Sequence, residues 1–345
     1  MTPARGIADG LELVDSRGEP LHTSGPWTLD TALRHVEFGC PWTIKGEHPQ
    51  LDLVRQRALE WMERFGLAPD IRLNEEQYRR WLLAESAAWW HPDADADRLQ
   101  IAADYLGWVF TPFDDVFDGP VGKDVASAAR MCEEMAACLT LPDGETPRSR
   151  TPRVQAFSDL WQRSRRGRSR DWRDRAATHW RDYLAAQIAE VTNRVYGRTS
   201  TLCQLVIIKC VFPIFDMLEV VHDFEAPAPA WHTPLLHEIR QCCAEIITCT
   251  NDLVSADKEA AAGDGRNNLL LIAENVDGLT RPQAFERLRD MVHERYLRLR
   301  RLEPQIRDFD EILSPTERGD LRRYIDCLHN IVSGDNRWEH VSGRY

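Results

Sequence analysis

Apolar residues recur at steps of three and four along most of the chain, and this helical period is the feature that most constrains the fold. No run of alternating β-branched residues is longer than a few positions, and no repeat is present, so strands are not expected. The sequence therefore predicts an all-α fold, with helices over residues 51–65, 78–91, 97–113, 125–138, 154–163, 172–196, 202–223, 235–262, 282–305 and 314–334.

Gly- and Pro-containing breaks separate these segments, but none resembles an interdomain linker. A chain of 345 residues is long enough to bury a large core. Residues 1–35 carry Gly and Pro with little periodicity, which indicates a loosely structured N-terminal lead-in. We expect residues 36–345 to form a single α-domain.

Charge and apolar patterning exclude several classes of protein. The net charge of −12 argues against a nucleic-acid-binding surface. Lys209 and Pro213 interrupt the longest apolar run, residues 205–215, so no membrane span is expected. The N-terminus lacks a secretory pattern, and nine cysteines occur without CxxC pairs. Most of the cysteines lie in apolar stretches, which is typical of reduced core residues in a cytoplasmic protein.

Asn251, Ser255 and Glu259 form the first chemically informative pattern. They are four residues apart, so they lie in one short stripe along a helix. An amide oxygen, a hydroxyl and a carboxylate are the hard oxygen donors that Mg²⁺ prefers. The residues before them are mostly apolar or small, and a buried polar stripe is costly unless something binds it. The alternative is a solvated face with Glu259 at a helix end.

Asp114, Asp115 and Asp118 form the second pattern. Asp114 and Asp118 share one helical face, and a Gly-Pro terminator follows at once. Carboxylates at a helix C-terminal end repel one another and oppose the helix dipole, which is unfavourable unless cations bind there. The alternative is an acidic helix end in solvent.

Two apolar helices that carry these patterns can face each other across a helical bundle. Between them they would hold several Mg²⁺ ions above an apolar cavity. Such a site suits a diphosphate ester with an apolar tail, since the metals neutralise the diphosphate and make it a leaving group.

With these motifs, residues 38 to 345 resemble the bacterial-type class I terpene synthase family. Residues 114–118 are similar to the family's aspartate-rich metal motif, and Asn251, Ser255 and Glu259 to its second metal motif. Residues 91–99, 193–194, 265–268 and the terminal Trp338…Arg344-Tyr345 are also similar to family positions. The resemblance implies a single-domain class I isoprenoid synthase helical bundle around a central apolar active-site cavity.

The resemblance also implies roles for individual residues and three Mg²⁺ ions as cofactors. Two ions would be bridged by Asp114 and Asp118 with support from Asp115, and the third would be chelated by Asn251, Ser255 and Glu259. Lys258 would contact the diphosphate or an acidic partner, and the diphosphate oxygens would accept hydrogen bonds from Arg344 and Tyr345. For the last two the alternative is a frayed terminus.

One position departs from the family. Relatives carry a diphosphate-sensing arginine on the helix ahead of the Pro213–Glu219 stretch, where the only cation in this sequence is Lys209. Lysine lacks the bidentate fork of arginine, so diphosphate sensing would be weaker or arranged differently. The alternative is a lysine that snorkels from an apolar helix.

Aromatic residues are the candidates for the wall of an apolar cavity, because ring faces stabilise a carbocation by about 0.5–2 kcal/mol without attacking it. Phe110 lies one turn before Asp114, and Trp338 occupies the family's C-terminal tryptophan position. Weaker candidates for substrate contact are Phe113, Phe212 and Phe215. Plain core packing is the alternative for each.

The resemblance implies an Mg²⁺-dependent terpene cyclase, a lyase that releases diphosphate from a linear prenyl diphosphate and cyclises the carbocation. Chain length favours farnesyl diphosphate (C15), but relatives that use geranylgeranyl diphosphate (C20) share every motif. The alternatives are a chain-elongating prenyl diphosphate synthase, which would carry a second aspartate-rich motif, and a non-catalytic helical protein that binds an apolar ligand. Relatives often form dimers, so a homodimer is also open.

Overall fold

The computed structural model describes residues 40–67, 75–110, 117 and 119–344, and throughout these ranges the regular structure is helical. The all-α prediction is confirmed. The helices are α2 (Leu51–Arg64), α3 (Glu75–Arg80), α4 (Leu83–Trp90), α5 (Ala96–Trp108), η2 (Val121–Lys123), α7 (Val125–Cys138), α8 (Pro152–Ser164), α9 (Arg170–Tyr196), α10 (Leu202–Ile208), α11 (Val211–His222), α12 (Ala228–Trp231), α13 (Pro234–Ala262), α14 (Leu269–Asn275), α15 (Arg281–Leu302), η3 (Glu303–Phe309) and α16 (Pro315–Val341).

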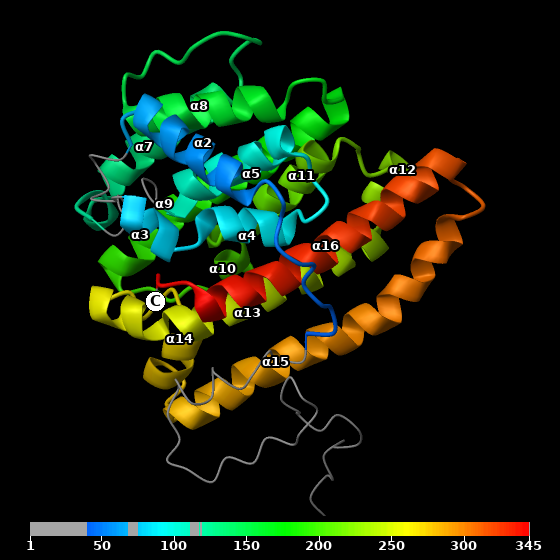
Figure 1. Cartoon of the computed structure of the whole chain (residues 1–345). Coiled ribbons are helices and arrows are strands. Elements are labelled where there is room, and N and C mark those ends of the chain that lie inside the picture. The colour runs from blue at the N-terminus through cyan, green and yellow to red at the C-terminus, as the bar shows by residue number, and fades with distance from the viewer. Residues whose placement is uncertain (1–39, 68–74, 111–116, 118, 345) are drawn as a thin grey trace, which may run out of the picture.

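Helix α13 is a central element of the bundle. It packs against α10, α11, α14, α15 and α16, and α16 in turn covers α4 (Figure 1). On the other side, α5 packs against α2, α4, α8 and α11, while α9 contacts α7, α10 and α11. A single cluster of buried apolar side chains runs through these helices. None of the described helices combines the length and apolar content that a membrane span requires.

Standard caps fix both ends of α13. The Thr233 hydroxyl accepts a hydrogen bond from the backbone N–H of Leu236, and Pro234 occupies the first helical position. Gly263 ends the helix with a φ of +81°, in the left-handed region that glycine adopts without strain. These 29 residues therefore carry the Asn251, Ser255 and Glu259 stripe on one uninterrupted helix, as predicted.

The predicted helix 202–223 is wrong at its middle. The structure breaks it into α10 and α11, and Cys210 between them has a φ of +63°. Pro213 explains the break, because it has no N–H to donate to the Lys209 carbonyl and its ring would clash with that carbonyl in a continuous helix. The break leaves Lys209 as the residue that caps the end of α10.

Other boundaries also differ from the prediction. The segment 78–91 is divided at Leu82, which has a φ of +54°, and the short helices α12 and α14 were not predicted. Helix α16 continues to Val341 rather than ending at Gly334. Gly334 does not end the helix but lets α16 approach α4 closely, since a Cβ on Gly334 would lie 2.7 Å from Cδ1 of Trp90.

We predict that Gly334→Ala lowers the free energy of unfolding by about 1–3 kcal/mol, because the added methyl group overpacks the contact between α16 and α4. Gly319 is the matched control on the same helix, since it is exposed and a Cβ added to it would have no atom within 4 Å. Gly319→Ala should stabilise the protein by about 0.5–1 kcal/mol through helix propensity. Urea unfolding measures both, and equal effects would contradict the packing argument.

Candidate active site

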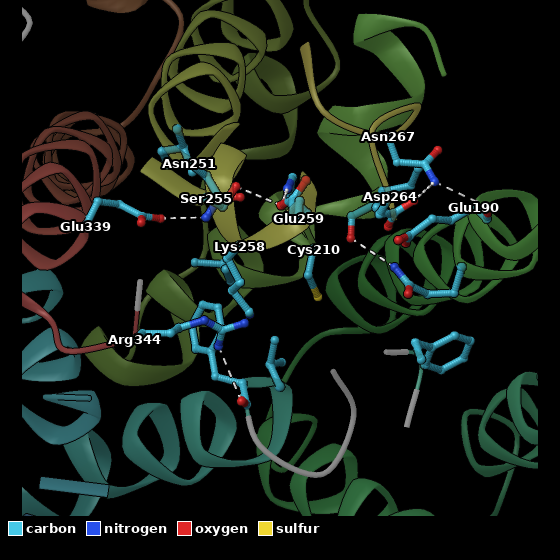
Figure 2. A pocket seen from close by; sticks show the side chains of 18 of the residues that line it. Glu190, Cys210, Asn251, Ser255, Lys258, Glu259, Asp264, Asn267, Glu339 and Arg344 are labelled. Atoms are coloured by element: carbon cyan, nitrogen blue, oxygen red, sulfur yellow. Dashed lines mark hydrogen bonds and ion pairs between the residues drawn. The ribbon is translucent and has the colours of Figure 1, made fainter. Parts of the chain in front are cut away.

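A cavity lies between α9, α11, α13 and α16, and the end of α5 contributes to its wall (Figure 2). Its lining divides into an apolar and a polar part. The described apolar lining residues include Trp90, Val109, Phe110, Phe117, Ile208, Ile214 and Ile247. The polar part includes the whole predicted stripe of α13, Asn251, Ser255 and Glu259.

A hydrogen bond to Glu339 of α16 fixes the side-chain amide of Asn251. Its Nδ2 donates to Oε1 of Glu339 over 2.7 Å (Figure 2). A carboxylate only accepts hydrogen bonds, so this contact decides which end of the amide faces Glu339. The amide oxygen, the atom with the chemistry of a metal ligand, is therefore turned away from Glu339.

Ser255 and Glu259 are linked directly. The Ser255 hydroxyl donates to Oε1 of Glu259 over 2.7 Å, and Nδ2 of Asn268 lies 3.4 Å from the same hydroxyl oxygen. The second oxygen of Glu259, Oε2, is buried and has no hydrogen-bond partner in the part of the chain that the structure describes. A buried carboxylate oxygen without a donor is an unsatisfied site that a bound cation would satisfy.

The ammonium of Lys209 lies against α13. Its Nζ is 3.0 Å from Oδ1 of Asp252 and 3.1 Å from Oε1 of Glu259. Asp252 is fully buried, and burial raises the pKa of its carboxyl group to about 6, an effect that Lys209 opposes. Lys209 thus lines the cavity and binds the metal-motif helix itself, a contact that the sequence did not indicate.

An acidic pair on the opposite wall was not predicted. Arg194 joins Glu190 at 2.9 Å and Asp264 at 2.6 Å, and its other nitrogen donates to the carbonyls of Phe117 and Gly122, both at 3.0 Å. Burial raises the pKa of Glu190 well above its ordinary value. The resemblance pointed to Arg194 and to residues 265–268, but nothing in the spacing indicated that Glu190 and Asp264 meet.

Two further carboxyl groups, Asp335 and Glu339, line the cavity from α16 and were also missed. Both are at least 95% buried. Burial, and then the charge of Glu339, raises the pKa of Asp335 well above its ordinary value, and its Oδ2 has no partner among the described residues. The four-residue spacing of Asp335 and Glu339 was the sequence signal that could have placed both carboxyl groups on one helical face.

Arg344 holds the C-terminal segment at the cavity. Its guanidinium carbon lies 4.5 Å from the ring centroid of Phe110 and 5.6 Å from that of Trp81. One guanidinium nitrogen donates to the Phe110 carbonyl over 3.3 Å, and the N–H of Gly343 donates to the Arg80 carbonyl over 2.9 Å. The described end of the chain is therefore packed against the cavity wall.

Lys258, one turn from Ser255 along α13, lines the same cavity.

The candidate aromatic residues lie in different places. Phe110 lines the cavity, whereas Trp338 is fully buried behind it, with the ring centroids 4.7 Å apart. The indole N–H of Trp338 donates to the Trp81 carbonyl over 2.7 Å. Phe212 and Phe215 are not part of the lining, since Phe212 stacks on His179 and Phe215 is fully buried.

The predicted residues Asp114, Asp115, Asp118, Phe113 and Tyr345 lie outside the described residues.

Comparison with known proteins decides the family. The model of terpene synthase family 2, C-terminal metal binding, matches residues 104–298, which include both metal motifs. The chain belongs to this terpene synthase family. Its predicted fold and enzyme class are confirmed, and the protein is a class I terpene cyclase. Such synthases act on prenyl diphosphates, and the family's description as metal binding agrees with a divalent metal.

Relatives and solved structures of terpene synthases cover most of the chain. R-linalool synthase of Streptomyces clavuligerus is 33% identical over 91% of this chain and 94% of its own length. A (−)-β-caryophyllene synthase of Saccharothrix espanaensis, whose name describes it as cyclising farnesyl diphosphate, is 30% identical over 93% of this chain and 90% of its own. The structure of wild-type cucumene synthase aligns with a TM-score of 0.77 and 37% identity, covering 87% of this chain and 99% of that one.

We predict that Asp335→Asn stabilises the metal-free terpene synthase at pH 8 by about 1–3 kcal/mol, because it removes a buried carboxyl group with an oxygen that no described residue satisfies. The native pKa of Asp335 is raised, so between the ordinary carboxyl pKa and this raised value the folded protein retains a proton that the unfolded chain releases. The free energy of unfolding therefore falls as pH rises through that interval.

Urea unfolding in the presence of EDTA between pH 5 and 8 measures this effect. The gain from Asp335→Asn should be larger at pH 8 than at pH 5. Asp326→Asn, at an exposed position of the same helix, is the control and should change little. A variant that is less stable than the parent protein at pH 8 would contradict the argument.

Proposed function

We propose that this terpene cyclase uses three Mg²⁺ ions to ionise a linear prenyl diphosphate, with farnesyl diphosphate as the preferred substrate. The observation that carries the proposal is the convergence of unlike groups on one cavity. Asn251, Ser255 and Glu259 line it together with Phe110, four residues before Asp114, and Phe117, the described residue within the aspartate-rich motif. Oxygen donors therefore meet an apolar wall, as a diphosphate with an apolar tail requires.

The donor set fits a Mg²⁺ ion. Asn251 has an oriented amide, Ser255 has a hydroxyl, and Glu259 has a buried oxygen that no described residue satisfies. We propose that these three bind one ion and that two more are bound by the remaining metal residues, Asp114, Asp115 and Asp118. When bound, the metal supplies the positive charge that turns the diphosphate into a leaving group.

Other residues of the chain would orient the diphosphate and keep water out. Lys258 and Arg344 line the cavity, and their cationic groups would donate hydrogen bonds to the diphosphate oxygens. We propose the same role for Tyr345, as the resemblance implies. The apolar wall excludes water, which would otherwise quench the carbocation. Arg344 already contacts Phe110 and Trp81, so the same residue would close the C-terminal segment over the bound substrate.

The preference for a C15 substrate rests on chain length and on relatives. The caryophyllene synthase described above is named for farnesyl diphosphate, and this chain covers nearly all of it. The rival within the fold is a chain-elongating synthase. The amide and hydroxyl at Asn251 and Ser255 speak against a second aspartate-rich motif at that place.

The substrate prediction is tested by incubation with C10, C15 and C20 prenyl diphosphates and Mg²⁺, followed by mass spectrometry of the products. We expect a cyclic C15 hydrocarbon or alcohol together with free diphosphate. Isopentenyl diphosphate is then added as a co-substrate, and it should not lengthen the prenyl chain. A longer prenyl diphosphate would support the elongating synthase instead, and absence of diphosphate release with every substrate would contradict both enzymes.

The metal assignment predicts that Asp114→Asn and Asn251→Ala each lower turnover to below about one hundredth of the parent value at ordinary Mg²⁺ concentrations, because each removes an oxygen ligand. Gas chromatography of the product measures the loss. Asp257→Asn is the control, since Asp257 is an exposed residue of α13 that pairs with Arg281. If both ligand variants cyclise normally, the metal assignment is wrong.

A further inference from the structure

Lys209 lies where relatives carry a diphosphate-sensing arginine, and its contacts with α13 suggest an additional role that the metal motifs do not assign. It caps the end of α10, next to the break at Cys210, and its ammonium reaches across to α13. There it contacts Asp252, which follows the proposed ligand Asn251, and Glu259, which is itself a proposed ligand. A cation of the chain therefore lies at the place where a metal ion is proposed to bind.

The contact with Glu259 involves Oε1, to which both the Lys209 ammonium and the Ser255 hydroxyl donate. The Lys209 Nζ is 3.1 Å from Oε1 of Glu259, and the Ser255 hydroxyl donates to this oxygen over 2.7 Å. A metal ion on the other oxygen, Oε2, which no described residue satisfies, would bind the same carboxylate group. The ammonium and the metal would then share one carboxylate, where two cations repel each other in a poorly solvated site.

Asp252 holds the lysine in place. It is fully buried, its Oδ2 accepts the N–H of Leu269 over 2.8 Å, and its Oδ1 lies 3.0 Å from the ammonium. A buried carboxylate needs a compensating cation. Lys209 supplies that charge to Asp252 and Glu259 together, so the acidic helix is stable before any metal binds.

A diphosphate is the group that can draw the lysine away. It carries several negative charges, and Lys209, Lys258 and Arg344 all line the cavity that would receive it. Lysine suits such a movement because its compact charge sits on a flexible four-carbon stem. Transfer of the ammonium from Glu259 to a diphosphate oxygen would relieve the repulsion at the carboxylate.

We propose that Lys209 is an internal counter-ion of the second metal motif, which weakens metal binding there until a prenyl diphosphate takes over its ammonium. This inference rests on the proposed function, because it uses the same metal ligands. It assigns Lys209 as a positioning residue that couples metal binding to substrate binding. The enzyme would thereby fill its third metal position only when a diphosphate is present to be ionised.

The test is Mn²⁺ binding by the metal-free enzyme, measured by electron paramagnetic resonance with and without inorganic diphosphate. Without diphosphate, Lys209→Met should bind Mn²⁺ at least tenfold more tightly than the parent enzyme, because the competing cation is gone. Diphosphate should tighten Mn²⁺ binding to the parent enzyme more than to the variant. Equal or weaker Mn²⁺ binding by Lys209→Met without diphosphate would overturn the proposal.

Three further variants locate the effect. Lys209→Arg retains the charge and should stay within about threefold of the parent affinity. Adding Glu259→Gln to Lys209→Met should abolish the gain, which places it at this motif rather than at the aspartate-rich one. If Lys209→Met does not fold, as judged by circular dichroism, Lys209→Gln is measured in the same way and with the same expectation.

The proposed function is tested separately, by diphosphate release from farnesyl diphosphate. Tighter Mn²⁺ binding by Lys209→Met without any diphosphate release by the parent enzyme would support the counter-ion and reject the proposed substrate. Normal release by the parent enzyme with unchanged Mn²⁺ binding by the variant would reject the counter-ion and leave the proposed function intact.

Discussion

Burying acidic side chains in an apolar helical bundle is unfavourable unless cations accompany them, and the cavity of this terpene synthase is organised by that constraint. Carboxyl groups outnumber cationic side chains among its described lining residues. Arg194 accompanies the acids of α9 and the loop after α13, and Lys209 those of α13. Asp335 of α16 has an oxygen that no described residue satisfies, and its buried environment favours the protonated form. A site with this excess of acid is suited to divalent metal ions.

The scaffold places these groups through two local features. Helix α13 runs uninterrupted between a threonine cap and a glycine cap, so three oxygen donors stay on one face. Pro213 interrupts the neighbouring helix, which sets Lys209 at the end of α10 beside α13. One continuous helix and one broken helix thus bring a carboxylate and its counter-ion together. Val109 and Phe110 after α5, Tyr183 of α9 and Ile214 of α11 complete the cavity wall.

The sequence predicts what depends on local order and misses what depends on packing. Helical periodicity indicated the all-α class and most helices, and four-residue spacing placed Asn251, Ser255 and Glu259 on one face. The break at Cys210 was missed because Pro213 was used only as evidence against a membrane span and not as the end of a helix. Glu190, Asp264, Asp335 and Glu339 come from separate helices and a loop, so only the folded chain shows that they share a cavity. The same limit applies to aromatic residues, since Phe110 faces the cavity and Trp338 lies behind it.

The central claim is that oxygen donors of α13 bind metal at the same cavity that receives the diphosphate. The most direct measurement is a crystal structure of the enzyme with Mn²⁺ and inorganic diphosphate, in which anomalous scattering locates the manganese ions. The account predicts a manganese peak bonded to oxygens of Asn251, Ser255 and Glu259 and to the diphosphate. Diphosphate bound in the cavity with no manganese at these three residues would contradict it.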